Sequence, residues 1–544
     1  VLDKPLEKIG GKGVFIDGIE CAMLAGEIDI AVHSAKDLPL RLAEGTRICA
    51  VLPRADAHDV LVTRKGEGLP ERPVVGTSST RRAAGVRKML RDPVIKDIRG
   101  NVDTRLQKLA DGQYDAIVLA AAGLYALLRR HALPVPKHAA LWAMVLCLVL
   151  NLTWVLVIRI EPFSDYQEYW DVACALASGT EIPDAWYVAM YPHILGTASI
   201  LSILVRVFGM SVFPVTVFNV LLTTLSCGLV WLLAKKLLSE RAAFLAAILW
   251  AVTPGKLMLG SLVFSEPIYT FLILLFFLLF LRLDKVLEAK PVPALCLAAG
   301  LGLLLAAVNL VRPIAAILLI AAALWLLLLR GEKAKNGRLW MLWAATFLAM
   351  TGVFQVSGAL WDRHVETVLG QEIASVPWYN IYVGFNEETG GRYADADMDL
   401  LTAYLKEGKT ANEAQKSMIP HVKERLASGL NFPRLFASKL FSFLGADQLG
   451  GYTYRFTRSE RFVKLCMGVC NVFYYGIFLA AITGVRRMFR SRKLSAGLLL
   501  PLYFLGLTLA HMLVEVADRY HYSLIPILII FAALGFDGEE RSAI

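Results

Sequence analysis

The sequence predicts two unlike parts in one chain, an α/β region followed by an all-α polytopic membrane region of about 10 transmembrane helices. Residues 1–128 alternate short apolar runs with helical patterns, whereas long apolar segments follow one another from about residue 139. Hydrophobic residues make up 56% of the chain, and the mean hydropathy is +0.55. Both values exceed those of ordinary soluble proteins. We therefore expect domains at 1–128 and 139–544, with a basic junction at 129–138.

In the α/β region, residues 28–32 and 116–120 form short apolar runs typical of buried strands. Residues 18–25 and 80–90 have helical periodicity. The polar residues 77–79 come directly before the second of these helices. Because unpaired N–H groups and the helix dipole attract negative charge, we expect an anion site there.

The membrane region contains ten apolar segments long enough to span a bilayer. They are 139–160, 212–234, 240–256, 264–281, 292–311, 313–329, 339–360, 464–484, 495–514 and 521–536. Basic residues cluster in alternate loops between these segments, and such loops face the cytoplasm in multi-pass proteins. The charge pattern therefore places the amino-terminal module and the carboxyl terminus in the cytoplasm of a protein of the cell membrane.

This topology leaves two loops outside the cell, 161–191 and 361–462. It also requires the apolar segment 190–208 to lie along the outer interface, as an amphipathic helix does. A spanning helix at 190–208 would invert every later loop.

The net charge of +10 does not predict a nucleic-acid partner, because the basic residues lie in the short loops between apolar segments. The eight cysteines form no framework of paired spacings. We predict neither a disulfide scaffold nor a metal site, and the expected surrounding is the lipid bilayer.

Four motifs in the first region carry a resemblance to a known family. They are Gly-Gly-Lys-Gly-Val-Phe at 10–15, Ala-Val-His-Ser-Ala-Lys-Asp-Leu-Pro at 31–39, Gly-Thr-Ser-Ser-Thr-Arg-Arg at 76–82 and Arg-Gly-Asn-Val-Asp-Thr-Arg-Leu at 99–106. In this order they closely resemble hydroxymethylbilane synthase, also called porphobilinogen deaminase. The resemblance implies a partial deaminase module whose fold is like that of periplasmic binding proteins, acting in tetrapyrrole biosynthesis.

The resemblance also implies roles for individual residues. Asp37 matches the catalytic aspartate, which stabilises the cation formed when porphobilinogen loses ammonia. Four arginines match those that hold the carboxylates of the dipyrromethane cofactor and the growing chain, because guanidinium groups pair bidentately with carboxylates. The arginines are Arg81, Arg82, Arg99 and Arg105, and further polar contacts match Lys36, Ser34, Thr77, Ser78 and Ser79.

The first region departs from the family in three ways. It has Asp17-Gly18 where the family commonly has a Lys-Glu pair, its start lies within a motif, and the cysteine that attaches the cofactor is absent. Neither Cys21 nor Cys49 has the attachment context. Without that thiolate no primer forms, so we expect the module to be inactive. A domain cut at both ends favours a chimeric merger over a working bifunctional protein.

The membrane region resembles the GT-C superfamily of glycosyltransferases, of the protein O-mannosyltransferase and aminoarabinose-transferase type. The matching features are Ser-Asp-Tyr-Gln-Glu-Tyr at 164–169, Pro254, Ser-Glu-Pro at 265–267, Asn309, Arg-Pro at 312–313, Gly-Phe-Asn-Glu-Glu at 384–388 and Asp-Arg-Tyr at 518–520. All lie on the expected outer side.

This second resemblance implies transfer of a sugar from a polyprenyl-phosphate donor to an acceptor hydroxyl. Asp165 is the expected general base, with Glu168 as the second candidate. Arg312 and Arg519 are expected to neutralise the lipid phosphate, because an arginine near bilayer depth needs a partner. Interfacial anchoring of both arginines is the competing interpretation.

Two other functions remain open. The membrane region could be a transporter or scaffold that carries an inactive deaminase remnant, although it has no visible inverted repeat. The first region could be a ligand-binding module of the periplasmic type, although Asp37 would then have no role.

Overall fold

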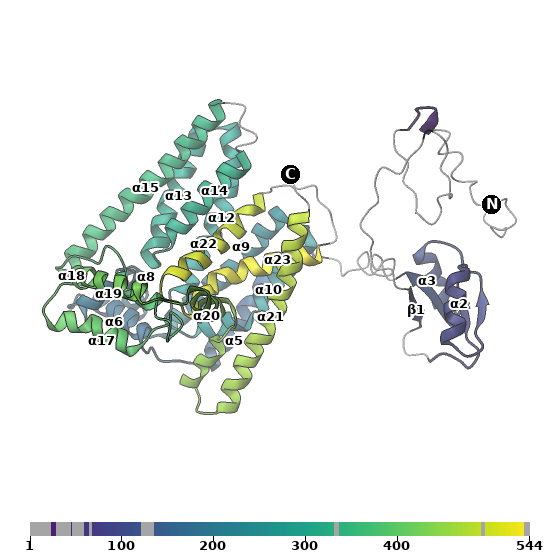
Figure 1. The fold of residues 1–544 in the computed structure, drawn as a ribbon, viewed down its shortest axis with the longest axis horizontal. Coiled ribbons are helices and arrows are strands. Elements are labelled where there is room, and N and C mark those ends of the chain that lie inside the picture. The colour runs from purple at the N-terminus through teal and green to yellow at the C-terminus, as the bar shows by residue number, and fades with distance from the viewer. Residues whose placement is uncertain are drawn as a thin grey trace. The chain divides into compact units, whose positions relative to one another are not determined.

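A computed structural model describes residues 23–28, 45, 59–64, 68–120, 135–330, 337–490 and 496–537. The chain divides into two compact units, Val1–Leu133 and Pro134–Ile544. The first is a small α/β unit and the second is almost entirely helical (Figure 1).

The first unit contains a four-stranded sheet with the order β1-β4-β2-β3. Strand β4 (Ala116–Ala120) pairs antiparallel with β1 (Asp59–Thr63) and parallel with β2 (Val74–Gly76). Strand β3 (Val94–Lys96) is parallel to β2. Because β4 is paired on both edges and the side chains of residues 116–119 are buried, it forms the centre of this unit.

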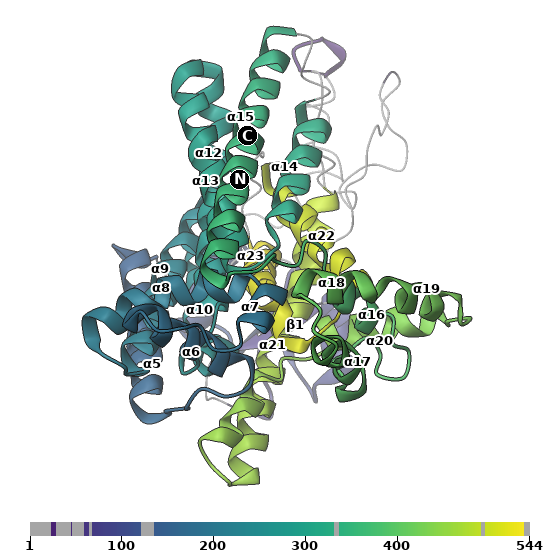
Figure 2. The same ribbon diagram turned by 90° about the vertical axis from the view of Figure 1, so that its left-hand side faces the viewer.

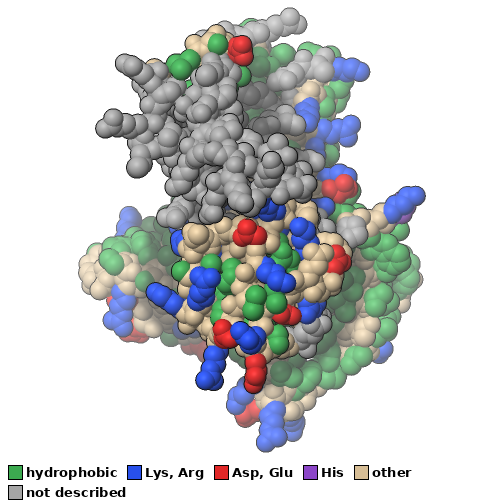
Figure 3. Space-filling model, turned by 90° about the vertical axis from the view of Figure 1, so that its right-hand side faces the viewer, with side chains coloured by type: hydrophobic (Ala, Val, Ile, Leu, Met, Phe, Trp, Pro, Cys, Tyr) green, Lys and Arg blue, Asp and Glu red, His purple; other side chains and the backbone are tan. Residues whose placement is uncertain are grey.

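Two helices connect these strands, α2 (Thr80–Met89) and α3 (Val102–Ala110). Residues of the sheet contribute to two apolar clusters, one with Leu109 of α3 and the other with Val86 of α2. The predicted strand at 116–120 and the predicted helix at 80–90 are confirmed. Most of the predicted elements at 18–25 and 28–32 lies outside the described residues. On the face drawn in Figure 3, charged side chains of both signs are interspersed over the α/β unit.

The second unit is a helical bundle with a helical outer layer. The bundle consists of α-helices and short 3-10 helices. In chain order they are α5 (Ala139–Val157), α6 (Asp165–Ser178), α7 (Ala185–Met190), α8 (His193–Phe208), α9 (Phe213–Leu237), α10 (Glu240–Val252), α11 (Pro254–Gly260), α12 (Glu266–Ala289), α13 (Pro291–Val311), α14 (Ala315–Arg330), α15 (Gly337–Leu369), α21 (Glu460–Arg490), η4 (Ala496–Leu498), α22 (Leu499–Leu513), η5 (Asp518–Leu524) and α23 (Ile525–Phe536). The outer layer lies on one side of the bundle (Figure 2). It consists of α16 (Trp378–Gly384), α17 (Asp395–Lys406), α18 (Ala411–Ser417), α19 (Ile419–Ala427) and α20 (Phe432–Leu444), and η3 (Leu449–Arg455) follows it in the chain.

Within the described residues, six helices are long and apolar enough to cross a membrane. They are Ala139–Val157, Phe213–Leu237, Pro291–Val311, Leu339–Leu369, Glu460–Phe489 and Asp518–Phe536. The pair α10 and α11, bent by 49°, would make a seventh span. Shorter apolar helices cover His193–Phe208, Ala315–Leu328 and Leu499–Leu513. A multi-pass helical domain is therefore present, and the count of ten remains a prediction.

The bend between α10 and α11 follows from Pro254, which interrupts the helical hydrogen-bond pattern. The fully buried Lys256 donates from Nζ to the carbonyl of Ala251 at 2.8 Å. This bond satisfies a carbonyl group at the carboxyl end of α10. Carbonyl groups there lack helical partners, and the helix dipole favours a nearby cation.

Helices α21 and α23 pack against each other (Figure 1), and their backbones approach closely at Gly484. A Cβ atom at Gly484 would collide with the carbonyl oxygen of Phe531 in α23. The missing side chain thus permits the close approach of the two backbones, as small residues do in membrane helix packing.

We predict that Gly484→Ala lowers the thermal unfolding midpoint of the detergent-solubilised protein, because the added methyl must separate the two helices. The expected cost is about 1–3 kcal/mol. Gly476→Ala is the matched control on the same helix, since its Cβ would meet nothing within 4 Å. Equal midpoints for the two variants would contradict this packing.

Candidate functional site

Asp165 and Arg519 are 354 residues apart in the sequence and form an ion pair in the structure. Arg519 Nη2 donates to Asp165 Oδ2 at 2.6 Å. Asp165 begins α6, where the helix dipole favours a negative charge, and Arg519 lies in η5. The carboxylate side chain retains 42% of its exposure, so it remains open to solvent on one side.

Arg519 is also held by aromatic side chains. Its Nη1 donates to the hydroxyl of Tyr166 at 3.2 Å, and that hydroxyl donates to Tyr452 Oη at 3.1 Å. The Cζ atom of Arg519 lies 5.6 Å from the ring centroid of Tyr166 and 5.4 Å from that of Tyr520. These contacts fix the guanidinium by charge, hydrogen bonds and cation–π attraction.

Arg312 approaches the same aromatic ring of Tyr520. Its Cζ atom lies 4.5 Å from the centroid of that ring, and its Nη1 is 3.4 Å from Oε1 of Glu266. The side chain of Glu266 is 1% exposed, and that of Arg312 is 16% exposed. The structure thus brings three residues predicted from sequence, Asp165, Arg312 and Arg519, into one cluster around Tyr520.

Glu168 follows Asp165 by one turn of α6 and lies in a more acidic surrounding. Burial raises the pKa of its carboxyl, and the nearby carboxylates of Asp184, Asp171 and Asp165 raise it further. The raised pKa means that Glu168 holds its proton to higher pH than an ordinary glutamate.

Glu515 was missed by the sequence reasoning. Its Oε2 accepts from Asn380 Nδ2 at 3.0 Å, and its backbone N–H donates to the carbonyl of Asn380 at 2.8 Å. Burial raises the pKa of Glu515, while Arg519 lowers it. The acidic Glu515 just before the Asp-Arg-Tyr motif was the available signal, but nothing in the sequence pointed to Asn380.

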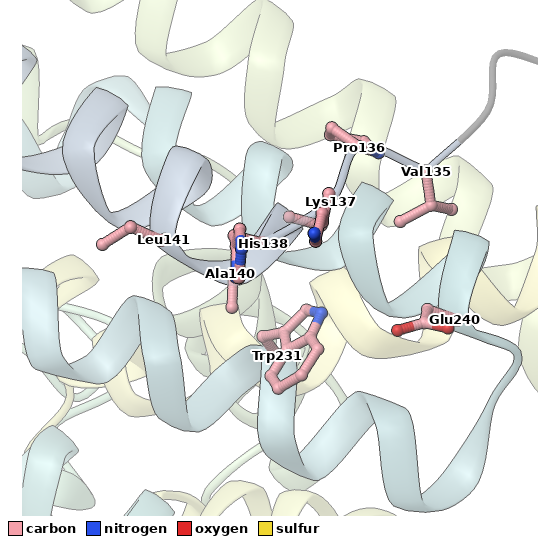
Figure 4. A pocket seen from close by; sticks show the side chains of 9 residues that line it. Val135, Pro136, Lys137, His138, Ala140, Leu141, Trp231 and Glu240 are labelled. Atoms are coloured by element: carbon pink, nitrogen blue, oxygen red, sulfur yellow. The ribbon is translucent and has the colours of Figure 1, made fainter.

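A separate pocket of about 520 Å³ lies beside the start of α5 (Figure 4). It is lined by Lys137, His138, Trp231 and Glu240, together with apolar residues of 135–141. It contains none of the predicted site residues.

In the α/β unit, two predicted arginines share one carboxylate. Arg81 Nη2 is 2.8 Å from Asp59 Oδ2, and Arg82 Nε is 2.9 Å from Asp59 Oδ1. Asp59 was not predicted as part of this site. Burial lowers the pKa of Arg105, and Arg82 lowers it further, while Arg105 Nε donates to the carbonyl of Gly100.

The polar residues before α2 serve the local fold. Ser78 Oγ bonds to both the N–H and the carbonyl of Ile98, and Ser79 Oγ caps α2 by accepting from the N–H of Arg82. Thr77 is buried, and its backbone N–H donates to the backbone carbonyl of Lys96. The carbonyl of Arg99 accepts from Lys108 Nζ. Three further predicted residues, Ser34, Lys36 and Asp37, lie outside the described residues.

Across the described ranges, no group of three or more His, Cys, Asp or Glu side chains is placed to hold a metal ion. The chemistry available at the Asp165 cluster is that of one partly exposed carboxylate beside two guanidinium groups. Such a set can accept a proton and bind an anion.

Comparison with known proteins assigns a family likeness to each part. Residues 1–144 match the family described as porphobilinogen deaminase, dipyromethane cofactor binding domain. Residues 193–356 match the family described as dolichyl-phosphate-mannose-protein mannosyltransferase. The chain therefore joins a porphobilinogen deaminase-like region to a glycosyltransferase-like membrane region, and both are transferase families. These matches confirm the two resemblances and do not favour the transporter or scaffold alternative.

Among curated proteins, the porphobilinogen deaminase of Syntrophobacter fumaroxidans is 53% identical over 128 residues, which are 23% of this chain and 41% of that protein. The enzyme of Roseiflexus sp. (strain RS-1) is 56% identical over 127 residues, 23% of this chain and 42% of that protein. The chain thus spans about two-fifths of the length of these relatives.

Two solved structures show a partial likeness to this chain. The archaeal oligosaccharyltransferase AglB from Archaeoglobus fulgidus, in complex with an inhibitory peptide and a dolichol-phosphate, has a TM-score of 0.41 and 14% identity, covering 73% of this chain and 50% of its own. ArnT from Cupriavidus metallidurans, bound to undecaprenyl phosphate, has a TM-score of 0.35 and 13% identity, covering 73% of this chain and 77% of its own.

We predict that Glu266→Gln destabilises the protein by about 1–3 kcal/mol, because it leaves the partly buried Arg312 without its carboxylate. Thermal unfolding in detergent measures this loss. Replacing both residues together, by Glu266→Gln and Arg312→Gln, is expected to cost less than the sum of the two single changes. Strictly additive losses would show that the two side chains do not act as a pair.

Proposed function

We propose that residues 139–544 form a membrane glycosyltransferase that moves a sugar from a polyprenyl-phosphate donor to an acceptor hydroxyl. The observation that carries this proposal is the ion pair between Asp165 and Arg519, beside the second arginine Arg312. A base and a phosphate-binding pair of guanidinium groups are the parts that this transfer needs.

In the proposed step, the carboxylate of Asp165 takes the proton of the acceptor hydroxyl as its oxygen attacks the anomeric carbon of the sugar. The bond from that carbon to the phosphate oxygen breaks, and its electron pair leaves with the polyprenyl phosphate. Arg519 and Arg312 stabilise the leaving phosphate, because charge in a water-poor site needs nearby opposite charge. Glu168, whose carboxyl has a raised pKa, is the second candidate base.

The ion pair implies an order of binding. In the structure Oδ2 of Asp165 accepts from Arg519 at 2.6 Å, so this oxygen is occupied by the guanidinium while the ion pair is intact. A donor phosphate competes for the same guanidinium. In our proposal, donor binding draws Arg519 from Asp165 and so frees the base for the acceptor.

For the α/β region, proposed here as residues 1–128, we propose a carboxylate-binding role like that of its relatives. Arg81 and Arg82 hold the carboxylate of Asp59 in the structure, so these guanidinium groups fit a ligand that carries carboxylates. Dipyrromethane and porphobilinogen-type molecules are ligands of this class. Arg99, Arg105 and Thr77–Ser79 complete the proposed contacts, and Asp37, Lys36 and Ser34 retain the roles that the motif implies.

We further propose the topology expected from the charge pattern. Ten spans, with α8 along the outer interface, place both termini in the cytoplasm and the loops 161–191 and 361–462 outside. The proposed site would then face outward, because Asp165 lies in the first of these loops and Arg519 opens the last span.

The transfer test uses membranes that contain the full chain, a labelled polyprenyl-phosphate sugar and hydroxyl acceptors. We expect Asp165→Asn to reduce kcat by about 100-fold or more, since the amide has nearly the same shape and no basicity. Asp171→Asn is the matched control on α6, where Asp171 accepts from Gln167. Undiminished transfer by Asp165→Asn would remove Asp165 as the base.

The same variants test the order of binding without any transfer. Asp165→Asn is expected to bind polyprenyl phosphate as tightly as the parent or more tightly, because a competing carboxylate is gone. Arg519→Ala is expected to bind it more weakly. Weaker binding by both variants would contradict the exchange of partners.

The topology is tested by single introduced cysteines and an impermeant reagent on intact cells. A cysteine at Lys409 should be labelled from outside, whereas one at Lys235 should react only after the cells are opened. Both positions are partly exposed in the structure. The reverse pattern would invert the orientation and move the proposed site to the inner face.

A further inference from the structure

Lys439 is a fully buried lysine in α20, with 0% of its surface exposed. Its Nζ donates to the carbonyl oxygens of Gly384, Met512 and Val514, each at 2.8 Å. A lysine ammonium has three N–H donors, and all three are used here. No part of the proposed reaction has accounted for this cation.

The three acceptors lie at the carboxyl ends of two helices. Gly384 is the last residue of α16, and Met512 and Val514 lie at the end of α22. The final carbonyl groups of a helix lack helical partners and carry partial negative charge. Lys439 therefore satisfies two helix ends at once and ties α16 of the outer layer to α22 of the bundle.

The backbones around Lys439 approach each other closely. A Cβ atom at Gly384 would lie 2.6 Å from the carbonyl carbon of Val514, and one at Gly391 would lie 2.9 Å from Lys439 Cδ. Gly391 has φ +77°, a conformation that other residues rarely adopt. The two glycines leave room for the lysine stem and for the chain beside it.

The segment 514–517, which we call the strap, leads directly from α22 to Asp518 and Arg519. The strap is bonded to the outer layer at the two residues that follow Val514. The N–H of Glu515 donates to Asn380 at 2.8 Å, and the N–H of Val516 donates to Gly391 at 2.9 Å. The position of Arg519 thus depends on how the strap is docked.

We propose that Lys439 is a positioning residue, whose ammonium holds the strap against α16 and so places Arg519 at Asp165 for sugar transfer. This inference rests on the proposed function for its effect on the reaction. The docking of the strap can be measured separately, without any substrate.

The protonation state of Lys439 decides whether all three of its hydrogen bonds to the helix ends can form. We call these three bonds the clamp. Burial lowers the pKa of Lys439 to about 8, and the charge of Glu515 acts in the opposite direction. The charged and titratable groups that face it are Glu515 on the strap and His511 on α22. Below this pKa the ammonium donates three bonds. Above it the neutral amine has two N–H groups and no charge, so the strap loosens as pH rises.

The first measurement is hydrogen exchange of the full-length protein in detergent, followed by mass spectrometry of peptides that cover the strap. In Lys439→Met the amides of Glu515 and Val516 are expected to exchange faster than in the parent. Lys464→Met is the matched control, because Lys464 is 76% exposed at the start of α21. Unchanged exchange of the strap in Lys439→Met would overturn the proposal.

The second measurement is the pH profile of transfer from a labelled polyprenyl-phosphate sugar. The parent is expected to lose activity with a midpoint at about 8, and Lys464→Met should behave like the parent. Lys439→Met is expected to lose about 100-fold in kcat, because small misplacement of a reacting group is costly. Its residual activity should show no such alkaline loss, and an unchanged alkaline midpoint in this variant would contradict the role of Lys439.

Failure of the proposed sugar transfer and failure of the Lys439→Met variant to fold give different results. If the parent transfers no sugar from any polyprenyl donor, the proposed function fails, and the exchange of the strap amides still decides the clamp. If Lys439→Met does not fold, Lys439→Arg replaces it. A guanidinium keeps its charge throughout the alkaline range in which a buried lysine loses its proton, so the strap of this variant should remain protected at alkaline pH, where that of the parent opens. Equal alkaline opening in both proteins would overturn the proposal.

Discussion

The guanidinium of Arg519 contacts Asp165, Tyr166 and Tyr520, and the arrangement of the candidate site depends on these contacts. They join the start of α6 to η5, which leads into the last helix. Without them, the carboxylate on α6 and the arginine on η5 would be separate features of two distant parts of the chain. Arg312, whose Cζ lies 4.5 Å from the centroid of the Tyr520 ring, adds the second positive charge.

Charge balance explains why each arginine has a carboxylate partner. An uncompensated guanidinium is costly where water is scarce, and removal of one member of a buried pair leaves the other unpaired. Arg312 has Glu266 and Arg519 has Asp165, so each guanidinium has a carboxylate partner in the structure. The two pairs differ in exposure, since Glu266 is 1% exposed and Asp165 is 42% exposed. The more open pair is the one that an incoming anion can reach, and its carboxylate is the proposed base.

Sequence patterns predicted those features that depend on local periodicity or on a recognisable motif. Strand β4 and helix α2 were predicted closely because a short apolar run and helical spacing are short-range signals. Asp165, Arg312 and Arg519 were found as motif residues on the expected outer side. Their meeting around one tyrosine ring could not be predicted from spacing, because it depends on how helices far apart in the sequence pack.

Asp59 and Lys439 were not predicted from the sequence, because their roles also depend on contacts that form only in the folded chain. Asp59 lies 22 and 23 residues before the arginines that it holds, outside any motif that marked it. Lys439 occurs in an amphipathic helix where a lysine normally faces solvent. Its burial follows from two helix ends that come together only in the folded protein. The number of spans remains a prediction, because α10 is bent against α11 and the apolar helices α14 and α22 are shorter than the six candidate spans.

The most direct test of the central claim is an experimental structure of the full-length protein bound to polyprenyl phosphate, compared with the protein alone. We expect the pair between Arg519 and Asp165 to be present without the lipid. With the lipid bound, Arg519 and Arg312 should contact its phosphate, and the carboxylate of Asp165 should be released toward solvent. A phosphate bound elsewhere, with the Arg519–Asp165 pair intact, would contradict the account.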